Sequence, residues 1–171
     1  MFQQLASSPG RWRRLPAGGS DKTKDFLLGG ADFQAGRKIT YVMFIDDAER
    51  CLKGLVHFGT ATEGPKGYVH GGASAAMLDM AMGNLCWWSG LKSVTAEMTV
   101  KYRSFLPLDS TVLVEAHIES STGRKHIISS SLSQFPPDDS SGPDAAGVVY
   151  SSGSGLFIQM RQHPSDTASK L

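Results

Sequence analysis

The stretch of sequence that decides the fold runs from Gly71 to Trp88 and reads GGASAAMLDMAMGNLCWW. It is rich in Ala and Met and free of Pro, which predicts one helix ending near Gly90. Because its residues are apolar on almost every side, we expect a central helix that is buried on most sides rather than one lying on a surface.

Strand-like segments lie on both sides of this helix in the sequence. Two precede it and four follow it: 38–45, 52–58, 93–103, 111–119, 124–133 and 148–160. One long apolar helix with about six antiparallel strands indicates an α+β fold, in which a curved sheet wraps round the helix. An open sheet leaves free edges, so we expect two chains to pair edge to edge.

Composition and charge exclude several classes of protein. The chain has 171 residues and a formal net charge of +1, which suits one globular domain and disfavours a nucleic-acid binder. It contains no run of 18 apolar residues, so we expect no membrane span. Two isolated cysteines, Cys51 and Cys86, are too few for a disulfide framework or a zinc site, which favours a reducing compartment.

The sequence predicts three parts: an N-terminal arm over 1–36 with a short helix near 21–28, a domain over 37–160, and a flexible tail over 161–171. The stretch 134–147 is rich in Pro, Asp, Ser and Gly and predicts a long hairpin loop. The arm carries three arginines and no acidic residue before Asp21, as mitochondrial transit peptides do, but no clear amphipathic helix. A mitochondrial and a cytoplasmic location therefore both remain open.

Asp79 is the most conspicuous candidate for a functional residue, since it is the one charged residue in the predicted helix. An ionised carboxylate in apolar surroundings is costly unless something pairs with it or uses it. We therefore interpret Asp79 as a general base or a nucleophile. The structural alternative is a narrow solvated stripe that Asp79 shares with Asn84.

The loop before the helix is the second candidate. It reads GPKGYVHGG over 64–72, and its glycines allow a ligand to approach the backbone, where the first N–H groups of the helix can act as oxyanion donors. His70 could instead orient the loop by bonding to the backbone. Gly72 and Asp79 lie seven residues apart, roughly 10 Å along one helix. One chain cannot bring both to a common reacting atom, so a real site would be shared by two antiparallel helices in a dimer.

Thr95 is a third candidate, on the first strand after the helix. Regular alternation over 93–103 places it on a polar face with Glu97, Thr99 and Lys101, where its hydroxyl could orient a water molecule or bond to a carboxylate. A lone Thr in a strand more often reflects β propensity alone.

Three segments together, EGPKGYVHGGASAAMLDMAMG, SVTAEMTVKYRSFLPL and GRKHIISSSL, resemble the hotdog-fold thioesterases. The resemblance covers about 41–160 and is greatest to the PaaI-like branch, in particular to thioesterase superfamily members 4 and 5, which hydrolyse acyl-CoA. It implies a hotdog fold, a homodimer or a dimer of such dimers, an acyl-CoA substrate, and no cofactor or metal. The insert before Gly147 and the pair Trp87–Trp88 depart from the family pattern and leave the acyl-chain length open.

Carried over by position, the resemblance gives Asp79 the catalytic carboxylate role and Thr95 the supporting hydroxyl. His70, Gly71 and Gly72 match the segment whose backbone N–H polarises the thioester carbonyl. Since CoA is polyanionic, Arg103, Arg124 and Lys125 are candidate phosphate contacts, although basic residues at strand ends are usually just solvated.

The sequence also allows three alternatives to an acyl-CoA thioesterase. The run Gly72–Ala76 is a poor nucleophile elbow, because a loop rather than a strand precedes its serine. A hotdog hydratase is disfavoured, because its catalytic His follows an Asp, whereas His70 precedes Asp79. A non-catalytic acyl-CoA or protein-binding module with this fold remains open.

Overall fold

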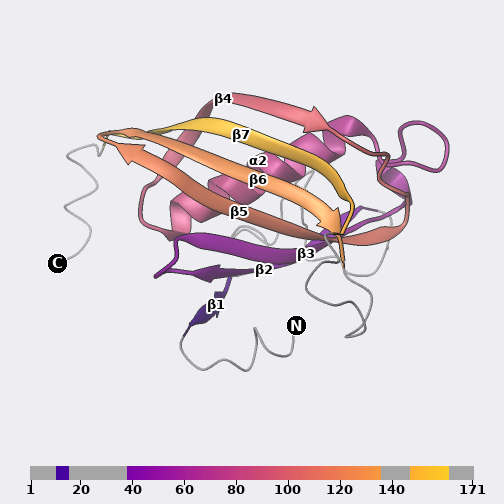
Figure 1. The fold of residues 1–171 in the computed structure, drawn as a ribbon, viewed down its shortest axis with the longest axis horizontal. Coiled ribbons are helices and arrows are strands. Elements are labelled where there is room, and N and C mark those ends of the chain that lie inside the picture. Colours follow the sequence, from indigo (N-terminus) through magenta and orange to yellow (C-terminus); the bar gives the residue numbers. More distant parts are fainter. Residues whose placement is uncertain (1–10, 16–37, 136–146, 162–171) are drawn as a thin grey trace, which may run out of the picture.

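The computed structural model describes residues 11–15, 38–135 and 147–161. In this part of the chain a single long helix lies against a seven-stranded antiparallel sheet (Figure 1). The sheet order is β1-β2-β3-β5-β6-β7-β4, so β1 and β4 form its two edges. The elements are β1 (Trp12–Arg14), β2 (Ile39–Asp46), β3 (Cys51–Phe58), the 3-10 turn η1 (Thr60–Thr62), α2 (Gly71–Trp88), β4 (Ser93–Tyr102), β5 (Ser110–Thr122), β6 (Lys125–Gln134) and β7 (Val149–Gln159).

Helix α2 has the bounds that the sequence predicts. His70 caps its start, and Gly90 follows its end with a φ of +79°, a left-handed conformation that glycine adopts without strain. One face of α2 is fully buried against the sheet, and its residues recur at helical spacing: Ser74, Met77, Leu78, Ala81, Met82, Leu85 and Cys86. In the single chain the opposite face is half-buried or exposed, which differs from the expected burial on most sides.

The sheet curves round α2, and the helix packs mainly against β3 to β7 (Figure 1). Inward-facing apolar side chains of those strands complete the core with the buried face of the helix, among them Leu52, Val56, Val114, Ile128 and Phe157. The six predicted strands are present, and the expected α+β architecture is confirmed.

The first strand after the helix does not alternate regularly. In β4, Thr95 pairs with Phe157 and Glu97 with Leu156, so Ala96 is an extra residue that forms a β-bulge. A one-residue shift moves every side chain on one side of it to the other face. Thr95 therefore lies on the helix side of the sheet, and the prediction that it shares a face with Glu97, Thr99 and Lys101 was wrong.

Strand β1 is an addition to the predicted fold. It pairs with β2, and the buried side chain of Leu15 joins the core. Arg11 bonds to Asp46 at 2.6 Å, and Arg13 bonds to Asp47 at 2.9 Å. The helix predicted at 21–28 and most of the loop 134–147 lie outside the described residues, and the division at 36–37 and 160–161 stays a prediction.

Candidate active site

Asp79 and Thr95 meet at the edge of the sheet formed by β4. The Thr95 hydroxyl donates a hydrogen bond of 2.6 Å to Asp79 Oδ1. Asp79 comes from the middle of α2, and the bulge at Ala96 turns Thr95 toward it. The carboxylate is half-buried rather than enclosed, so it is open to water or to a second chain along the free edge.

The loop before α2 is held by His70. The Gly72 N–H donates to His70 Nδ1 at 2.9 Å, and the N–H groups of Ala73 and Ser74 donate to the His70 carbonyl oxygen. An Nδ1 that accepts a bond carries no proton, so a neutral His70 ring holds its proton on Nε2. His70 is thus the N-cap of the helix, as the loop-orienting alternative expects, and the Gly72 N–H is already engaged by it.

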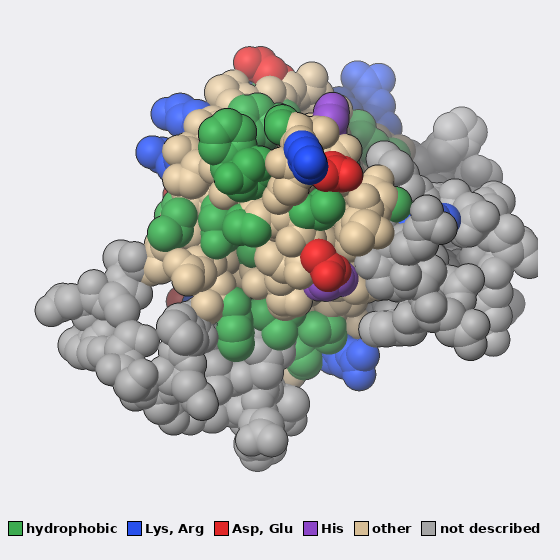
Figure 2. Space-filling view, turned by 90° about the vertical axis from the view of Figure 1, so that its right-hand side faces the viewer, with side chains coloured by type: hydrophobic (Ala, Val, Ile, Leu, Met, Phe, Trp, Pro, Cys, Tyr) green, Lys and Arg blue, Asp and Glu red, His purple; other side chains and the backbone are tan. Residues whose placement is uncertain are grey.

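A small pocket of about 170 Å³ opens beside the first turn of α2. Apolar and aromatic side chains from three parts of the chain line it, among them Val69, Tyr102, Phe105, Leu106 and Tyr150. Tyr102 also donates a hydrogen bond of 3.1 Å from its hydroxyl to the Gly71 carbonyl oxygen. Figure 2 looks onto the end of the molecule where α2 begins and shows hydrophobic side chains gathered in patches between polar ones.

Sequence reasoning missed this pocket. Neither Tyr102 nor the apolar residues of the loop after it received a role. The available signal was the number of large apolar residues between Val100 and Leu108, several of which stay exposed in the single chain, such as Tyr102 at 58% and Phe105 at 71%.

The two halves of the candidate site do not meet within one chain. Gly72 stands in the first turn of α2 and Asp79 two turns further on, roughly 10 Å along the axis. A group that activates water must lie within roughly 3 Å of it, and so must an oxyanion donor of its oxygen. The described part of the chain therefore holds a carboxylate with its hydroxyl, and separately a helix start beside an apolar pocket.

The three basic candidates lie apart. Arg103 directly follows Tyr102, close to the start of α2. Arg124 and Lys125 lie at the other end of β7, where Lys125 pairs with Ile158, whereas Tyr102 pairs with Ser151. Seven residues of strand separate the two positions, about 23 Å. Arg124 also donates two bonds to the Gln159 carbonyl oxygen, at 3.0 and 2.8 Å, which engages its guanidinium group.

Within the described residues, the cysteines and the metal-ligating side chains form no second reactive site. Both cysteines are free and buried, and burial raises the pKa of the Cys86 thiol to about 11. Such a thiol stays protonated and unreactive at neutral pH. Among the described residues, no three His, Cys, Asp or Glu side chains are placed so as to hold a metal ion. Nor does that part of the chain contain a helix long and apolar enough to cross a membrane.

Comparisons with known proteins agree with the fold. Residues 66–130, which span the loop, the helix and the first strands after it, match the Thioesterase superfamily. The solved structure of a thioesterase superfamily protein, RHA08564, superposes with a TM-score of 0.59 at 28% identity, over 69% of this chain and 53% of that one. The fold is therefore the hotdog fold of that superfamily.

Two of the relatives that the chain resembles in sequence are named acyl-coenzyme A thioesterases. The chain is similar to acyl-coenzyme A thioesterase THEM4 of Xenopus laevis, with 28% identity over 90% of this chain and 70% of that one. It is similar to THEM5 of Homo sapiens, with 25% identity over 88% of this chain and 59% of that one. A Candida albicans relative with 27% identity, covering 68% of this chain and 52% of that one, is described as an uncharacterized mitochondrial protein. The chain thus spans between half and 70% of the length of these relatives.

Proposed function

We propose that this chain, a hotdog-fold relative of the THEM4 and THEM5 acyl-coenzyme A thioesterases, hydrolyses fatty acyl-CoA to a free fatty acid and CoA. The observation that carries the proposal is the bond between Thr95 Oγ1 and Asp79 Oδ1 at 2.6 Å. It holds a carboxylate in a fixed orientation at an open edge of the sheet, as a general base or nucleophile requires. The reaction needs no cofactor, because CoA is itself part of the substrate.

The start of α2 is the proposed site of the thioester oxygen. The helix dipole and the first N–H groups favour the negative charge that develops on this oxygen. The Gly72 N–H becomes available to it once the His70 ring turns away, and that ring lies at the exposed surface, where it is free to turn. Gly71, next to Gly72 in the chain, lines the pocket beside the first turn of α2 and positions the neighbouring backbone.

Asp79 has two possible roles in the chemistry. As a general base it takes a proton from water while the water oxygen bonds to the thioester carbon. The C–S bond then breaks, and the Asp79 carboxyl returns its proton to the departing CoA thiolate. As a nucleophile it bonds to that carbon directly and releases CoA, and water then hydrolyses the acyl-enzyme anhydride. The Thr95 hydroxyl holds one carboxylate oxygen in both routes and leaves the other free to react.

The geometry favours a site shared by two subunits. Asp79 of one chain would act on a thioester held by the helix start of its partner, because the two groups lie roughly 10 Å apart within one chain. The free edge of β4 and the half-exposed apolar face of α2 support a homodimer, or a dimer of two such dimers. Arg103 is the one basic candidate near the helix start, and the positions of Arg124 and Lys125 favour a role elsewhere.

The proposed location is the mitochondrion. It rests on the description of the Candida albicans relative as mitochondrial, with the cytoplasm as the alternative. Imaging of the tagged chain in cells, with a mitochondrial marker, distinguishes the two locations.

The test of the proposed activity is the release of free thiol from a panel of short- to long-chain acyl-CoAs. We expect the wild-type chain to turn over at least one chain length, and the variant Asp79→Asn to lose roughly 10²- to 10⁴-fold in kcat. The variant Glu97→Gln is the matched control, because it neutralises an exposed carboxylate on the opposite face of the same sheet edge. Binding of acyl-CoA without any turnover would contradict the hydrolase and support a non-catalytic acyl-CoA-binding module.

A further inference from the structure

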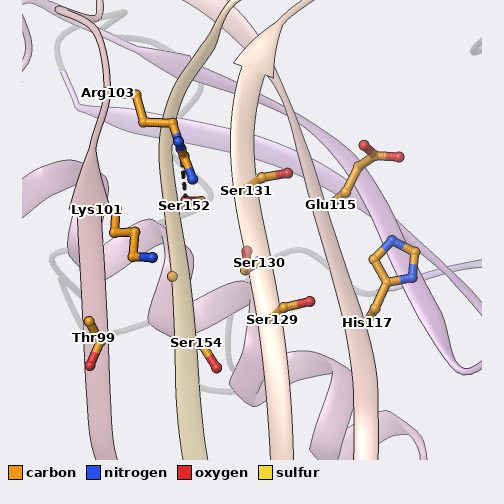
Figure 3. A pocket seen from close by; sticks show the side chains of 11 residues that line it. Thr99, Lys101, Arg103, Glu115, His117, Ser129, Ser130, Ser131, Ser152 and Ser154 are labelled. Atoms are coloured by element: carbon orange, nitrogen blue, oxygen red, sulfur yellow. Dashed lines mark hydrogen bonds between the residues drawn. The ribbon is translucent and has the colours of Figure 1, made fainter. Parts of the chain in front are cut away.

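A hollow of about 350 Å³ lies on the outer face of the sheet, the face turned away from α2 (Figure 3). It spans four neighbouring strands, β4, β7, β6 and β5, and none of the groups assigned to hydrolysis except Arg103 lines it. Volumes from about 300 Å³ upward are typical of sites for small molecules. We call this hollow the outer trough.

The strand register builds the outer trough. One row across the sheet runs Lys101, Ser152, Ser131 and Glu115, and the next runs Thr99, Ser154, Ser129 and His117. In these two rows the middle strands therefore contribute only serines, whereas the flanking strands contribute Lys101, Glu115 and His117 as long side chains, with Thr99. Figure 3 shows the resulting form, with a floor of short hydroxyl side chains between Lys101 and Arg103 on one side and Glu115 and His117 on the other.

The outer trough carries an excess of positive charge. Within the described residues, neither Lys101 nor Arg103 forms an ion pair, and Arg103 makes only a long bond of 3.4 Å from Nε to Ser152 Oγ. Glu115 on the opposite wall is already neutralised, because Lys53 Nζ lies 2.6 Å from its Oε1. Two cations thus face a floor of hydroxyl groups. Among the described residues only one of these hydroxyls, that of Ser129, bonds to a carboxylate, which belongs to Glu119 outside the lining.

These groups together suit one class of ligand. A phosphate ester offers the anionic oxygens that Lys and Arg bind, and a sugar offers hydroxyl groups that serines can bind as donors and acceptors. We propose that the outer trough binds the phosphorylated sugar of a nucleotide, with its phosphate on Lys101 and Arg103 and its sugar on the serine floor.

The nucleotide could come from two sources. One is the nucleotide end of CoA, in which case this inference rests on the proposed hydrolysis. Lys101 and Arg103 flank Tyr102, whose hydroxyl touches Gly71 on the other face of the sheet, so one strand end connects the trough with the helix start. The other source is a free nucleotide that binds independently of the substrate.

The direct test is calorimetric titration of the whole protein with adenosine 3′,5′-bisphosphate, with adenosine as the ligand that lacks phosphate. We expect the bisphosphate to bind and adenosine to bind far more weakly. The variant Lys101→Gln should weaken the bisphosphate by about tenfold, which corresponds to the loss of one charge-assisted bond. Lys92→Gln is the matched control, because Lys92 is exposed beyond the other end of β4, and it should bind like the wild type.

A second variant tests the shape of the site without a change of charge. Ser131→Leu fills the floor of the outer trough on an outward-facing strand position that tolerates an apolar residue, and it should also weaken binding by about tenfold or more. No binding of the bisphosphate by the wild type would overturn the proposal. Unchanged binding by both folded variants would overturn it equally.

Kinetics with two substrates separate the sources of the nucleotide. If it belongs to CoA, Lys101→Gln raises KM for acyl-CoA and leaves kcat/KM for the matching acyl-pantetheine unchanged. If the ligand is a free nucleotide, Lys101→Gln changes neither KM for acyl-CoA nor kcat/KM for acyl-pantetheine, while the affinity for the bisphosphate measured by calorimetry still falls. Because the titration needs no turnover, absence of hydrolysis would contradict the proposed function and leave the test of the outer trough intact.

Discussion

Asp79 and Thr95 form a pair that the sequence could only partly predict. Asp79 stands out because it is the one charged residue in an apolar helix, and burial of a carboxylate needs a reason. Thr95 carries no comparable signal, since Thr is common in strands. Regular alternation assigned it to the outer face, and a bulge at Ala96, which no residue pattern announces, turns it toward the helix instead.

The contact between these residues leads to a prediction about the Thr95 hydroxyl. Thr95→Val keeps the shape of the side chain and removes the donor to Asp79 Oδ1, so we expect kcat for acyl-CoA to fall roughly tenfold or more. Thr95→Ser retains a hydroxyl and should restore most of the rate. Steady-state kinetics measure both, with thermal unfolding as the check on folding. Equal rates for the Val and Ser variants would show that the hydroxyl does not position the carboxylate.

At the scale of elements, the long helix was predictable and the first strand was not. An 18-residue stretch without Pro that is closely followed by Gly90 strongly favours a helix ending near that glycine. Strand β1 is three residues long and reads WRR, which gives neither alternation nor length. Its pairing depends on tertiary contacts that local sequence does not encode, with Asp46, Asp47 and the core around Leu15.

The contribution of this N-terminal segment can be measured through Leu15. Its side chain is only 5% exposed, so Leu15→Ala should lower the free energy of unfolding by about 2–5 kcal/mol. Arg14→Ala, at an exposed position next to it, should change it by no more than about 0.5 kcal/mol. Urea unfolding curves of the two variants give both values. A Leu15 variant as stable as the wild type would mean that β1 does not dock as described.

At the scale of the whole molecule, the single chain leaves apolar surface that a partner would cover. The sequence predicted a helix buried on most sides, and one chain buries only one face of α2. The periodicity could not reveal this, because it reports apolar faces and not which chain covers them. The separation of Gly72 from Asp79 along the same helix leads to the same conclusion from the chemistry.

A substitution on the open face of α2 tests the dimer. Ala76 is half-buried in the single chain, and an Arg there costs a lone helix little. In a dimer that packs the two helices together it would bury an unpaired charge, so we expect Ala76→Arg to sediment as a monomer where the wild type sediments as a dimer. Ser154→Arg, on the outer face, should remain dimeric. Dimers of Ala76→Arg as tight as those of the wild type would place the interface elsewhere.

The stability of the whole fold should depend on pH through His126. Its side chain is 2% exposed, and burial lowers the pKa of His126 below the ordinary value of about 6.5, with a smaller contribution from Arg50. The unfolded chain then binds a proton at a higher pH than the folded one. This group therefore makes the protein less stable as the pH falls through about 6.5 and below, and stability is recovered as the pH rises.

The measurement is the free energy of unfolding of wild type and His126→Gln between pH 8 and pH 5. We expect the difference between them to change in that interval, with the wild type losing more stability at the acidic end. Parallel curves would show that His126 binds protons equally well in the folded and unfolded chain.

The most direct test of the account is the activity of a mixed dimer, made by coexpression of Asp79→Asn with Gly72→Pro under two affinity tags. Gly72→Pro removes the N–H proposed to hold the thioester oxygen, at a first-turn position where proline is tolerated. In a shared site, the mixed dimer combines an intact Asp79 with an intact Gly72 from the other chain, so it should recover about half of the wild-type thiol release, while each parent dimer stays inactive. A folded mixed dimer as inactive as its parents would contradict a site built from two subunits.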